Sequence, residues 1–360
     1  MTARQESSIR ERLPVAVLGA TGAVGQTFVR LLAGHPWFRL AEVAASDRSA
    51  GRRYGEVVKW LEGALPEETA SMQVVACDPA VVRSRIVFSA LDATAASTIE
   101  PAFAHAGAFV FSNTKNFRME PDVPLVIPEI NASHLDVLEA QRRGRGWPGA
   151  IVTNANCAAI AAALPLAVLH EAFGVRETFV FTMQAVSGAG YPGVASLDIL
   201  GNVIPYIGEE DAKIERELPK MLGRLADGRI EPASFRVSAQ ANRVAVEHGH
   251  TVCLSVALER RASADDCLAA LRAWSGDPCV RGLPSSPARA LLVMEAPDRP
   301  QPRRDVNTGK GMTVLVGRVR PDPILDVKLV ALSHNTVRGA AGASLLNAEL
   351  LATRGAFGSP

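Results

Sequence analysis

One cysteine in this 360-residue chain stands where a sulfur nucleophile would be expected. The run Asn154-Ala-Asn156-Cys157 leads directly into the helix-forming segment 158–164. Asn156 can cap that helix, which would place Cys157 in the first turn, where the helix dipole favours a thiolate. The alternative is a small buried core cysteine. The polar approach and the helix start favour the nucleophile.

A sulfur nucleophile needs a proton partner, and histidine titrates closest to neutrality. His250 stands immediately before an apolar run, and Arg243 precedes it by seven residues. The two could reach one pocket if this stretch loops over it. Four other histidines fall in or beside helical segments and are expected at the surface: His35, His105, His134 and His170.

Two further groups could bind a ligand. Gln184 precedes a glycine-rich turn that contains Ser187 and Gly188, and such turns let a ligand approach the backbone, although a plain loop fits almost as well. Glu210 and Lys213, three residues apart, would share one helix face. Taken alone, that pair reads as a solvated surface.

A second kind of chemistry is indicated near the N-terminus. The turn Gly19–Gly25, with Gly22 at its centre, lies between an apolar run and a helical pattern, so a pyrophosphate could meet a helix N-terminus there. The alternative is a purely structural turn. About 20 residues further on, Ser46, Arg48 and Ser49 suit a 2′-phosphate, which favours NADP. Asp47 could instead accept from a free ribose hydroxyl, and a solvated basic loop is the remaining alternative.

The elements that must position these residues form two groups. Apolar runs at 14–19, 40–45, 85–90 and 108–111, alternating with helical patterns at 23–32 and 95–105, predict a Rossmann-type parallel sheet over residues 1–150. Longer strands at 178–185, 251–258, 313–320 and 324–331 predict an α+β domain over residues 151–335 with a large mixed sheet. The last pair flanks a Pro-Asp-Pro turn and suggests an antiparallel hairpin. Overall the fold class is α/β.

The composition and net charge of the chain indicate which class of partner it binds. Hydrophobic residues make up 48% and charged residues 21%, and the net charge is +1. This balance favours a small-molecule ligand and gives no support for nucleic acid or a membrane surface. Five scattered cysteines predict neither a disulfide framework nor a metal site and fit a reducing cytoplasm. The polar residues 1–12 do not form a secretory signal.

Taken in order, these motifs resemble aspartate-semialdehyde dehydrogenase, particularly its archaeal and fungal branch. The resemblance runs from Gly19 to about Leu351. Its markers are the Gly19–Gly25 turn, Ser112–Met119, Asn156-Cys157, Gln184 with Ser187–Gly190, Gly208–Glu210 with Lys213–Glu215, Arg243 with His250, and Asn335–Gly342.

The resemblance implies NADPH-dependent reduction of L-aspartyl 4-phosphate to L-aspartate 4-semialdehyde and phosphate, on the route to lysine, threonine and methionine. Catalysis would involve Cys157 as nucleophile, His250 as general acid/base, Gln184 as the group orienting the intermediate, and Asn156. The substrate would be bound by Arg243 at its α-carboxylate, by Glu210 at its α-amino group, and by Arg118, Lys213 and Asn113 at its phosphate. The cofactor would be bound by Gly19, Thr21, Gly22, Ala23, Val24, Gly25, Ser46, Arg48, Ser49, Ser89, Ser187, Gly188 and Asn335.

The family also implies a homodimer or homotetramer, and a tail helix, at about 336–355, packed back on the first domain. The chain departs from the family at Ala158 and Ala159, where a Ser or Thr usually follows the cysteine, and in lacking a proline after Arg243-Val. These departures leave the catalytic rate open. Three alternatives stay open: a CoA-thioester reductase resembling malonyl-CoA reductase, the more distant N-acetylglutamyl-phosphate reductase, and a non-catalytic paralogue.

Overall fold

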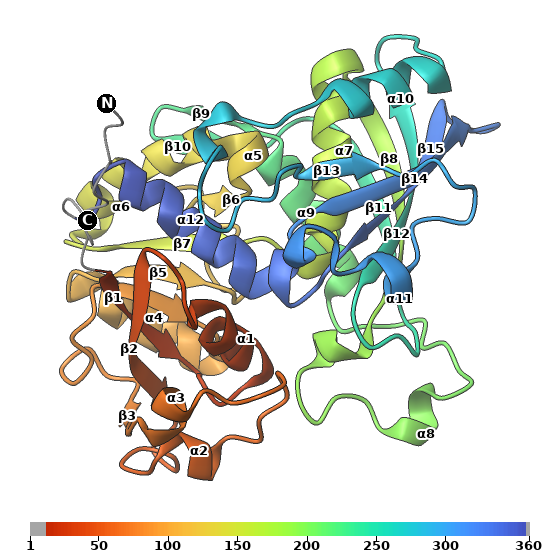
Figure 1. Ribbon diagram of the computed structural model, residues 1–360. Coiled ribbons are helices and arrows are strands. Elements are labelled where there is room, and N and C mark those ends of the chain that lie inside the picture. Colours follow the sequence, from red (N-terminus) through yellow and green to blue (C-terminus); the bar gives the residue numbers. More distant parts are fainter. Residues whose placement is uncertain (1–11, 358–360) are drawn as a thin grey trace, which may run out of the picture.

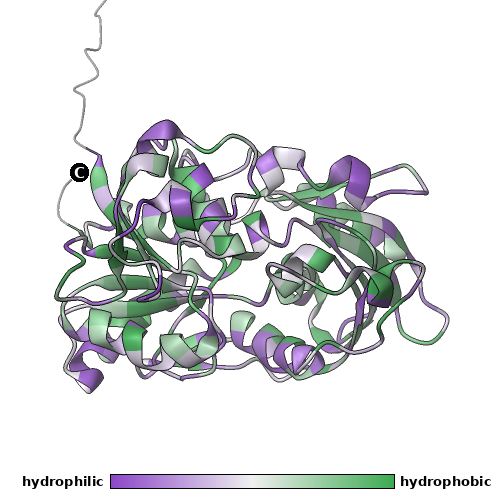
Figure 2. Ribbon diagram, turned by 90° about the horizontal axis from the view of Figure 1, so that it is seen from below, coloured by the Kyte–Doolittle hydropathy of each residue, from purple (hydrophilic) through white to green (hydrophobic). Residues whose placement is uncertain are grey.

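The computed structural model describes residues 12–357, which form two sheet-based units joined by long helices (Figure 1). Of the N-terminal stretch considered above as a possible secretory signal, all but Arg12 lies outside the described residues. No helix among residues 12–357 is long and apolar enough to cross a membrane. Figure 2 shows hydrophobic residues concentrated along the strands of both sheets.

The first unit contains a seven-stranded parallel sheet, as the alternating pattern predicts. Its strands lie in the order β3-β2-β1-β4-β5-β7-β6. Their bounds are β1 Leu13–Leu18, β2 Phe38–Ala45, β3 Val74–Ala76, β4 Ile86–Ser89, β5 Phe109–Ser112, β6 Leu125–Val126 and β7 Ala150–Asn154. The helices of this unit are α1 Ala23–Leu32, α2 Tyr54–Val57, α3 Glu67–Ser71, α4 Ala93–His105, α5 Pro128–Asn131 and α6 Leu138–Arg145.

Helices cover both faces of this sheet. Val15 and Val17 of β1 pack in one cluster with Phe28 of α1, whereas Ala16 and Leu18 pack in another with Phe103 of α4. Burial on both faces explains why these strands read as continuous apolar runs. Because all seven strands are parallel, their carboxyl ends meet at one edge, where ligands bind in such sheets.

Residue 150, where the first domain is expected to end, begins a strand of the first sheet. Residues 150–154 form β7, which pairs in parallel with β5 from Phe109↔Ala150 to Ser112↔Thr153. The division that we propose between the two units therefore falls after this strand, immediately before Cys157.

The second unit contains a six-stranded mixed sheet in the order β11-β8-β12-β15-β14-β13. Its strands are β8 Val175–Gln184, β11 Arg236–Arg243, β12 His250–Leu258, β13 Leu291–Val293, β14 Val314–Pro321 and β15 Val327–Ser333, and β9 Arg224–Ala226 with β10 Arg229–Glu231 forms a separate hairpin. The predicted hairpin is confirmed, since β14 and β15 pair antiparallel. The helices of this unit are α7 Cys157–Phe173, α8 Ser196–Ile199, α9 Glu210–Met221, α10 Ala264–Ala273 and α11 Pro302–Asp305, and α12 Gly342–Thr353 follows them in the chain.

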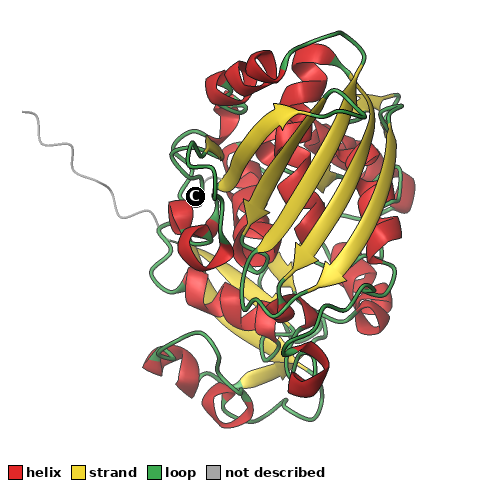
Figure 3. Ribbon diagram, turned by 90° about the vertical axis from the view of Figure 1, so that its right-hand side faces the viewer, coloured by secondary structure: helices red, strands yellow, loops and turns green. Residues whose placement is uncertain are grey.

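Within residues 12–357, helices cover one face of the second sheet only. Helices α7, α9 and α10 contribute to a core with inward residues of β8, β12 and β15, such as Val180, Val252 and Leu329. The opposite face is open to the viewer in Figure 3. On it, the side chains of Phe179 and Phe181 are 45% and 37% exposed.

The chain returns to the first unit at its end. Leu345 and Leu346 of α12 join the same apolar cluster as Val15 and Phe28. The α-helix begins later than the expected residue 336, because residues Val337–Ala341 form a π-helical segment directly before it. Arg338 in this segment makes a fully buried, bidentate ion pair with Glu129, at 2.7 and 2.9 Å.

Two histidines expected at the surface are buried instead. His35 is 6% exposed, and its Nε2 lies 2.9 Å from Oε1 of Glu349 in α12. His134 is 1% exposed, and its Nε2 lies 3.1 Å from the Gly223 carbonyl oxygen. The helical patterns around these residues gave no sign of the chain that covers them from elsewhere in the sequence.

Candidate active site

A cavity of about 620 Å³ lies where the carboxyl edge of the first sheet meets the second unit. It collects most of the residues singled out from the sequence. Those that line it are Gly22, Ala23, Val24, Asn113, Arg118, Asn156, Cys157, Gln184, Ser187, Gly188, Glu210, Lys213, Arg243 and Asn335. His250 does not line it but lies directly behind the cysteine.

Cys157 is the first residue of α7, as its sequence context predicts. The Asn156 side-chain oxygen caps the helix by accepting from the backbone N–H groups of Ala158 and Ala159, at 2.9 and 3.0 Å. Both alanines are fully buried. The helix start is thus satisfied without the hydroxyl that the family usually carries at these positions.

The sulfur has a histidine partner. Sγ of Cys157 lies 3.2 Å from Nε2 of His250, which is fully buried. On the other side of the ring, the Ala185 backbone N–H donates to Nδ1 at 3.0 Å. Strand pairing explains why the His250 ring lies beside Ala185, because His250 begins β12 and the neighbouring β8 ends at Gln184.

Burial acts against ionisation of the sulfur. It raises the pKa of Cys157 to about 12; Glu210 adds to the rise, while Arg118 and Arg243 oppose it. This direction is opposite to the one expected from the helix start, because desolvation of the sulfur outweighs the helix dipole. Burial and the nearby Arg243 charge also lower the pKa of His250, to about 3. Both shifts favour the uncharged form of each group.

Strand β11 positions the arginine. Arg243 is the last residue of β11 and stands in register with Gln184, the last residue of β8. Its Nη1 donates to the Ala185 carbonyl at 2.8 Å. A Cβ on Gly188 would lie 3.0 Å from the same Nη1, so glycine there leaves room for the guanidinium. Arg243 was a candidate from its place in the sequence, but the strand that carries it was not predicted.

Helix α9 presents an acidic group to the same cavity. Glu210 accepts from Nδ2 of Asn156 at 2.5 Å and pairs with Nζ of Lys213 at 3.2 Å. Glu210 is 6% exposed. The solvated-surface interpretation of this pair is therefore wrong: the pair lies at the cavity wall.

The sequence interpretation missed Glu217. Its carboxylate accepts from Nη1 of Arg118 at 2.9 Å and from the Asn156 backbone N–H at 2.6 Å, and it is 2% exposed. A second nitrogen of Arg118 donates to the Asn113 carbonyl at 2.9 Å. The available signal was spacing, since Glu210 and Glu217 are seven residues apart and share one helix face.

Gly339 was also missed, although it lies inside a run that carried the family resemblance. A Cβ on Gly339 would lie 2.6 Å from Cβ of Cys157. The π-helical segment therefore packs its backbone directly against the nucleophile. Other lining residues that the sequence did not single out are Asp92, Lys115, Tyr191 and Thr336.

The cofactor end fits a dinucleotide. Helix α1 begins after Gly22 with no side-chain cap, so its first N–H groups are available to a pyrophosphate. A Cβ on Gly25 would come within 2.2 Å of the Gly19 carbonyl oxygen, so this turn requires glycine. Near Cys157, Asn335 donates to Oγ of Ser187 at 2.8 Å and accepts from the Gly249 N–H at 2.9 Å.

Some predicted cofactor residues lie outside this cavity: Gly19, Thr21, Gly25, Ser46, Arg48, Ser49 and Ser89. Ser46, Arg48 and Ser49 form the turn after β2, next to the glycine turn after β1. Arg48 is exposed and makes no ion pair within residues 12–357. Ser89 ends β4, is buried, and accepts from Nδ2 of Asn113 through its carbonyl at 3.0 Å. No cluster of three or more potential metal-ligating side chains occurs in the described part of the chain.

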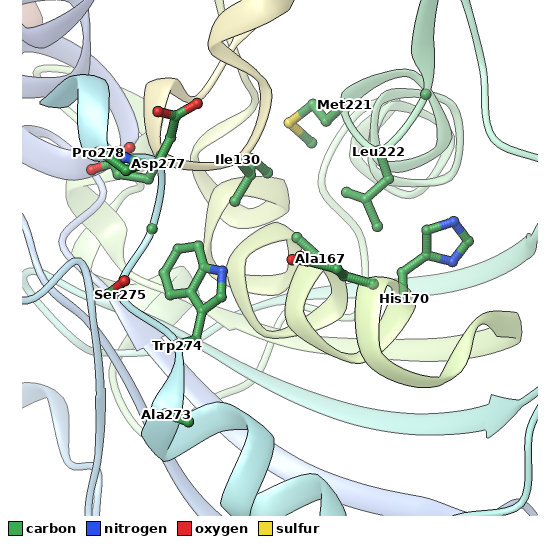
Figure 4. Close-up of a pocket in the computed structure, with 14 residues that line it drawn as sticks. Ile130, Ala167, His170, Met221, Leu222, Ala273, Trp274, Ser275, Asp277 and Pro278 are labelled. Carbon is green, nitrogen blue, oxygen red and sulfur yellow. The ribbon is translucent and has the colours of Figure 1, made fainter.

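A separate cavity of about 670 Å³ lies near the other end of α7 (Figure 4). Trp274, His170 and Met221 are among its lining residues. Ala167 of its wall is ten residues along α7 from Cys157, about 15 Å at the helical rise. None of the residues singled out for catalysis or cofactor binding lines it.

The parallel sheet, the glycine turn and the cysteine–histidine pair define a nicotinamide-nucleotide-dependent dehydrogenase with a sulfur nucleophile. Two family models match the chain: semialdehyde dehydrogenase, NAD binding domain, over residues 14–138, and semialdehyde dehydrogenase, dimerisation domain, over residues 166–338.

Relatives identify the family more closely. An aspartate-semialdehyde dehydrogenase of Archaeoglobus fulgidus is 48% identical over 341 residues, covering 94% of this chain and 98% of the relative. That of Schizosaccharomyces pombe is 47% identical over 350 residues, covering 95% and 98%. A crystal structure of the Candida albicans enzyme with NADP has a TM-score of 0.88 at 41% identity, covering 96% of this chain and all of that one. The chain belongs to the aspartate-semialdehyde dehydrogenase family.

Proposed function

We propose that this protein reduces L-aspartyl 4-phosphate to L-aspartate 4-semialdehyde and phosphate with NADPH, in lysine, threonine and methionine biosynthesis. The observation that carries the proposal is the Cys157–His250 pair, 3.2 Å apart, at a cavity wall that also holds Arg243 and Glu210. The free state of all five cysteines is consistent with a reducing cytoplasm.

The charges around the sulfur support a substrate that is itself an amino acid. Arg243 offers a guanidinium fork for the α-carboxylate, and Glu210 a carboxylate for the α-ammonium group. An ammonium group beside Glu210 would also offset the charge that raises the pKa of Cys157. Substrate binding would thus favour ionisation of the nucleophile.

The cations that line the same cavity support a phosphate subsite. Arg118 and Lys213 line the cavity together with Asn113. Each cation already has a carboxylate partner, Glu217 or Glu210, which holds it in place. In the mechanism that we propose, Cys157 attacks the acyl carbon, these cations stabilise the departing phosphate, and Gln184 orients the acyl group.

A bound nicotinamide nucleotide supplies the hydride in the reductive step. We propose that the first turn of α1 holds its pyrophosphate, that Ser46, Arg48 and Ser49 hold the 2′-phosphate, and that Ser187, Gly188 and Asn335 lie against the nicotinamide. The uncapped start of α1 and the NADP bound in the Candida albicans structure support this assignment.

The test is a steady-state assay in the reverse direction, with L-aspartate semialdehyde and NADP⁺. We expect NADP⁺ reduction that depends on phosphate and is lost in Cys157→Ala. If CoA replaced phosphate as the required acceptor, the CoA-thioester reductase alternative would stand instead. A lack of activity with both phosphate and CoA would favour the non-catalytic paralogue.

We further propose that the protein is a homo-oligomer that pairs through the open face of the second sheet. Phe179 and Phe181 lie on that face, and Phe181 is in register with Cys253 of β12. Exposed aromatic side chains on a sheet are typical of an interface. The dimerisation-domain model covers all of β8, β11 and β12.

A further inference from the structure

One lysine is buried against the segment that joins β5 to β6, residues 113–124. Lys220 lies near the end of α9 and is 2% exposed. Its ammonium group donates to three backbone carbonyls, those of Arg118 and Glu120 at 2.6 Å and that of Val123 at 2.8 Å. An ammonium group has three N–H donors and no acceptor, so these carbonyls satisfy it completely. A single side chain therefore fixes the backbone of this segment at three points.

Helix α9 contacts Arg118 a second time, at its guanidinium group. Glu217, which stands three residues before Lys220 on α9, accepts from Nη1 of Arg118 at 2.9 Å. A second nitrogen, Nη2, donates to the Asn113 carbonyl at 2.9 Å. The third, Nε, is buried and has no hydrogen-bond partner within residues 12–357. Helix α9 therefore holds both the backbone and the side chain of Arg118.

The spacing of charged residues along α9 explains how one helix reaches both the substrate cavity and this segment. Four of them follow one another at intervals of three, four and three residues and so share one face of the helix: Glu210, Lys213, Glu217 and Lys220. The first two line the cavity of the candidate active site. The last two do not line it and instead contact Arg118, which does.

We propose that Lys220 is a positioning residue for phosphate, which holds the backbone at Arg118 so that the guanidinium group stays at the cavity wall. The inference rests on the function proposed above and deepens it at the phosphate subsite. Without the ammonium group, the carbonyls of Arg118 and Val123 would have no donor in the described part of the chain. Because unsatisfied buried carbonyls are costly, the segment would shift and take the guanidinium group with it.

The protonation state of Lys220 makes these contacts depend on pH. Burial lowers the pKa of Lys220 to about 8, and the carboxylates of Asp122, Glu120 and Glu217 oppose that fall without cancelling it. Burial, and after it the charge of Lys220, lowers the pKa of His134, which therefore adds no positive charge in this range. Above its pKa, Lys220 is a neutral amine with two N–H donors for three carbonyls. The contacts should therefore weaken as the pH rises through about 8.

Lys220→Met tests the proposal in the phosphate-dependent assay, because it keeps the length of the side chain and removes its charge and donors. We expect the KM for phosphate to rise about 10–100-fold, the usual scale for a displaced binding group, and the KM for L-aspartate semialdehyde to stay close to wild type. Lys310→Met, the same change at an exposed residue, is the matched control and should alter neither. Equal rises in both KM values would mean a general loss of structure and would overturn the proposal.

A double variant shows whether Lys220 acts through Arg118. If the guanidinium group is its only route to phosphate, Lys220→Met should raise the KM for phosphate no further in an Arg118→Ala background. An increase of the same factor in both backgrounds would mean that Lys220 affects phosphate independently of Arg118, contrary to the proposal.

Direct binding of inorganic phosphate does not depend on turnover, so it separates this inference from the proposed function. Isothermal titration calorimetry of the wild-type enzyme from pH 7.5 to 10 covers the range in which Lys220 loses its proton, while phosphate stays mainly the dianion. We expect the affinity for phosphate to fall about tenfold as the pH rises through this range, and the fall to be absent in Lys220→Met, where binding is weak throughout.

An affinity that does not change with pH in the wild type, or a fall that persists in Lys220→Met, would overturn the proposal. If Lys220→Met does not fold, the wild-type series decides alone. Phosphate binding with the expected pH dependence but without phosphate-dependent turnover would count against the proposed function and leave the role of Lys220 in place.

Discussion

At Cys157, two opposing effects act on one sulfur. The helix start stabilises a thiolate, and burial disfavours it more strongly, with Glu210 adding to the same effect. The nucleophile is therefore controlled by its neighbours' charges rather than by the helix alone. Substrate groups that pair with those neighbours would change its reactivity.

Glu210→Gln tests this control. Removal of the negative charge lowers the pKa of Cys157, so alkylation by iodoacetamide at pH 8 should become faster than in wild type. The same change removes the partner of the substrate ammonium group, so KM for L-aspartate semialdehyde should rise about 10–100-fold. Glu139→Gln, at an exposed residue of α6 in the first unit, is the control and should alter neither. Slower alkylation in Glu210→Gln would be inconsistent with this account.

Arg48→Ala tests cofactor selection. Arg48 is exposed in the turn after β2, where a 2′-phosphate is expected. Loss of a charge-assisted hydrogen bond should weaken NADPH about tenfold or more and leave NADH nearly unchanged, as measured by KM for each. Arg52→Ala serves as the control, because Arg52 faces Glu56 on the exposed surface. Equal losses for both cofactors would mean that Arg48 does not contact the 2′-phosphate.

At the scale of elements, the sequence predicted those whose pattern reflects their own burial. The apolar runs of β1, β4 and β5 and the whole of α1 were found, because both faces of this sheet are covered. Strand β11 was not predicted, because its residues 236–243 alternate polar and small side chains at the edge of the second sheet. Its pairing with β8 is a long-range contact that leaves no local signal.

The candidate site follows the same rule. Cys157, Arg243 and Glu210 could be named because their types and motifs are distinctive. The sequence could not show that Glu217 accepts from the Asn156 N–H, or that Gly339 touches Cys157, since both contacts join segments far apart in the chain.

Gly339→Ala tests the contact between the π-helical segment and the nucleophile. The added Cβ would lie 2.6 Å from Cβ and 2.9 Å from Cα of Cys157, so the helix start must shift. We expect a loss of about 1–3 kcal/mol in the free energy of unfolding and at least a tenfold fall in kcat. In the control Gly144→Ala on α6, no atom lies within 4 Å of the added Cβ, and activity should be unchanged. Wild-type turnover in Gly339→Ala would show that the π-helical segment can shift without disturbing Cys157.

For the whole molecule, the second sheet raises the question of what covers its open face. Phe179 and Phe181 project from β8, and Cys253 and Val330 continue the apolar surface across β12 and β15. The covered face alone cannot explain apolar side chains on the opposite one. A second copy of the chain packed on the open face would bury the apolar side chains of β8 and those of β12 and β15.

Phe181→Glu tests this assembly. A charge on this face should shift the mass in sedimentation velocity from the oligomer toward the monomer, because an unpaired buried carboxylate is costly. Val81→Glu is the control: Val81 is 45% exposed, but it lies in the first unit. An unchanged oligomer in Phe181→Glu would place the interface elsewhere.

The central claim is that Cys157 holds the acyl group after hydride has passed to NADP⁺ and until phosphate accepts that group. Intact-mass spectrometry tests it directly after the enzyme is mixed with NADP⁺ and L-aspartate semialdehyde in phosphate-free buffer. We predict a mass increase of one aspartyl group, located at Cys157 by peptide mapping, absent in Cys157→Ala, and lost when phosphate is added. Rapid NADP⁺ reduction with no adduct on Cys157, or an adduct that phosphate leaves in place, would contradict the account.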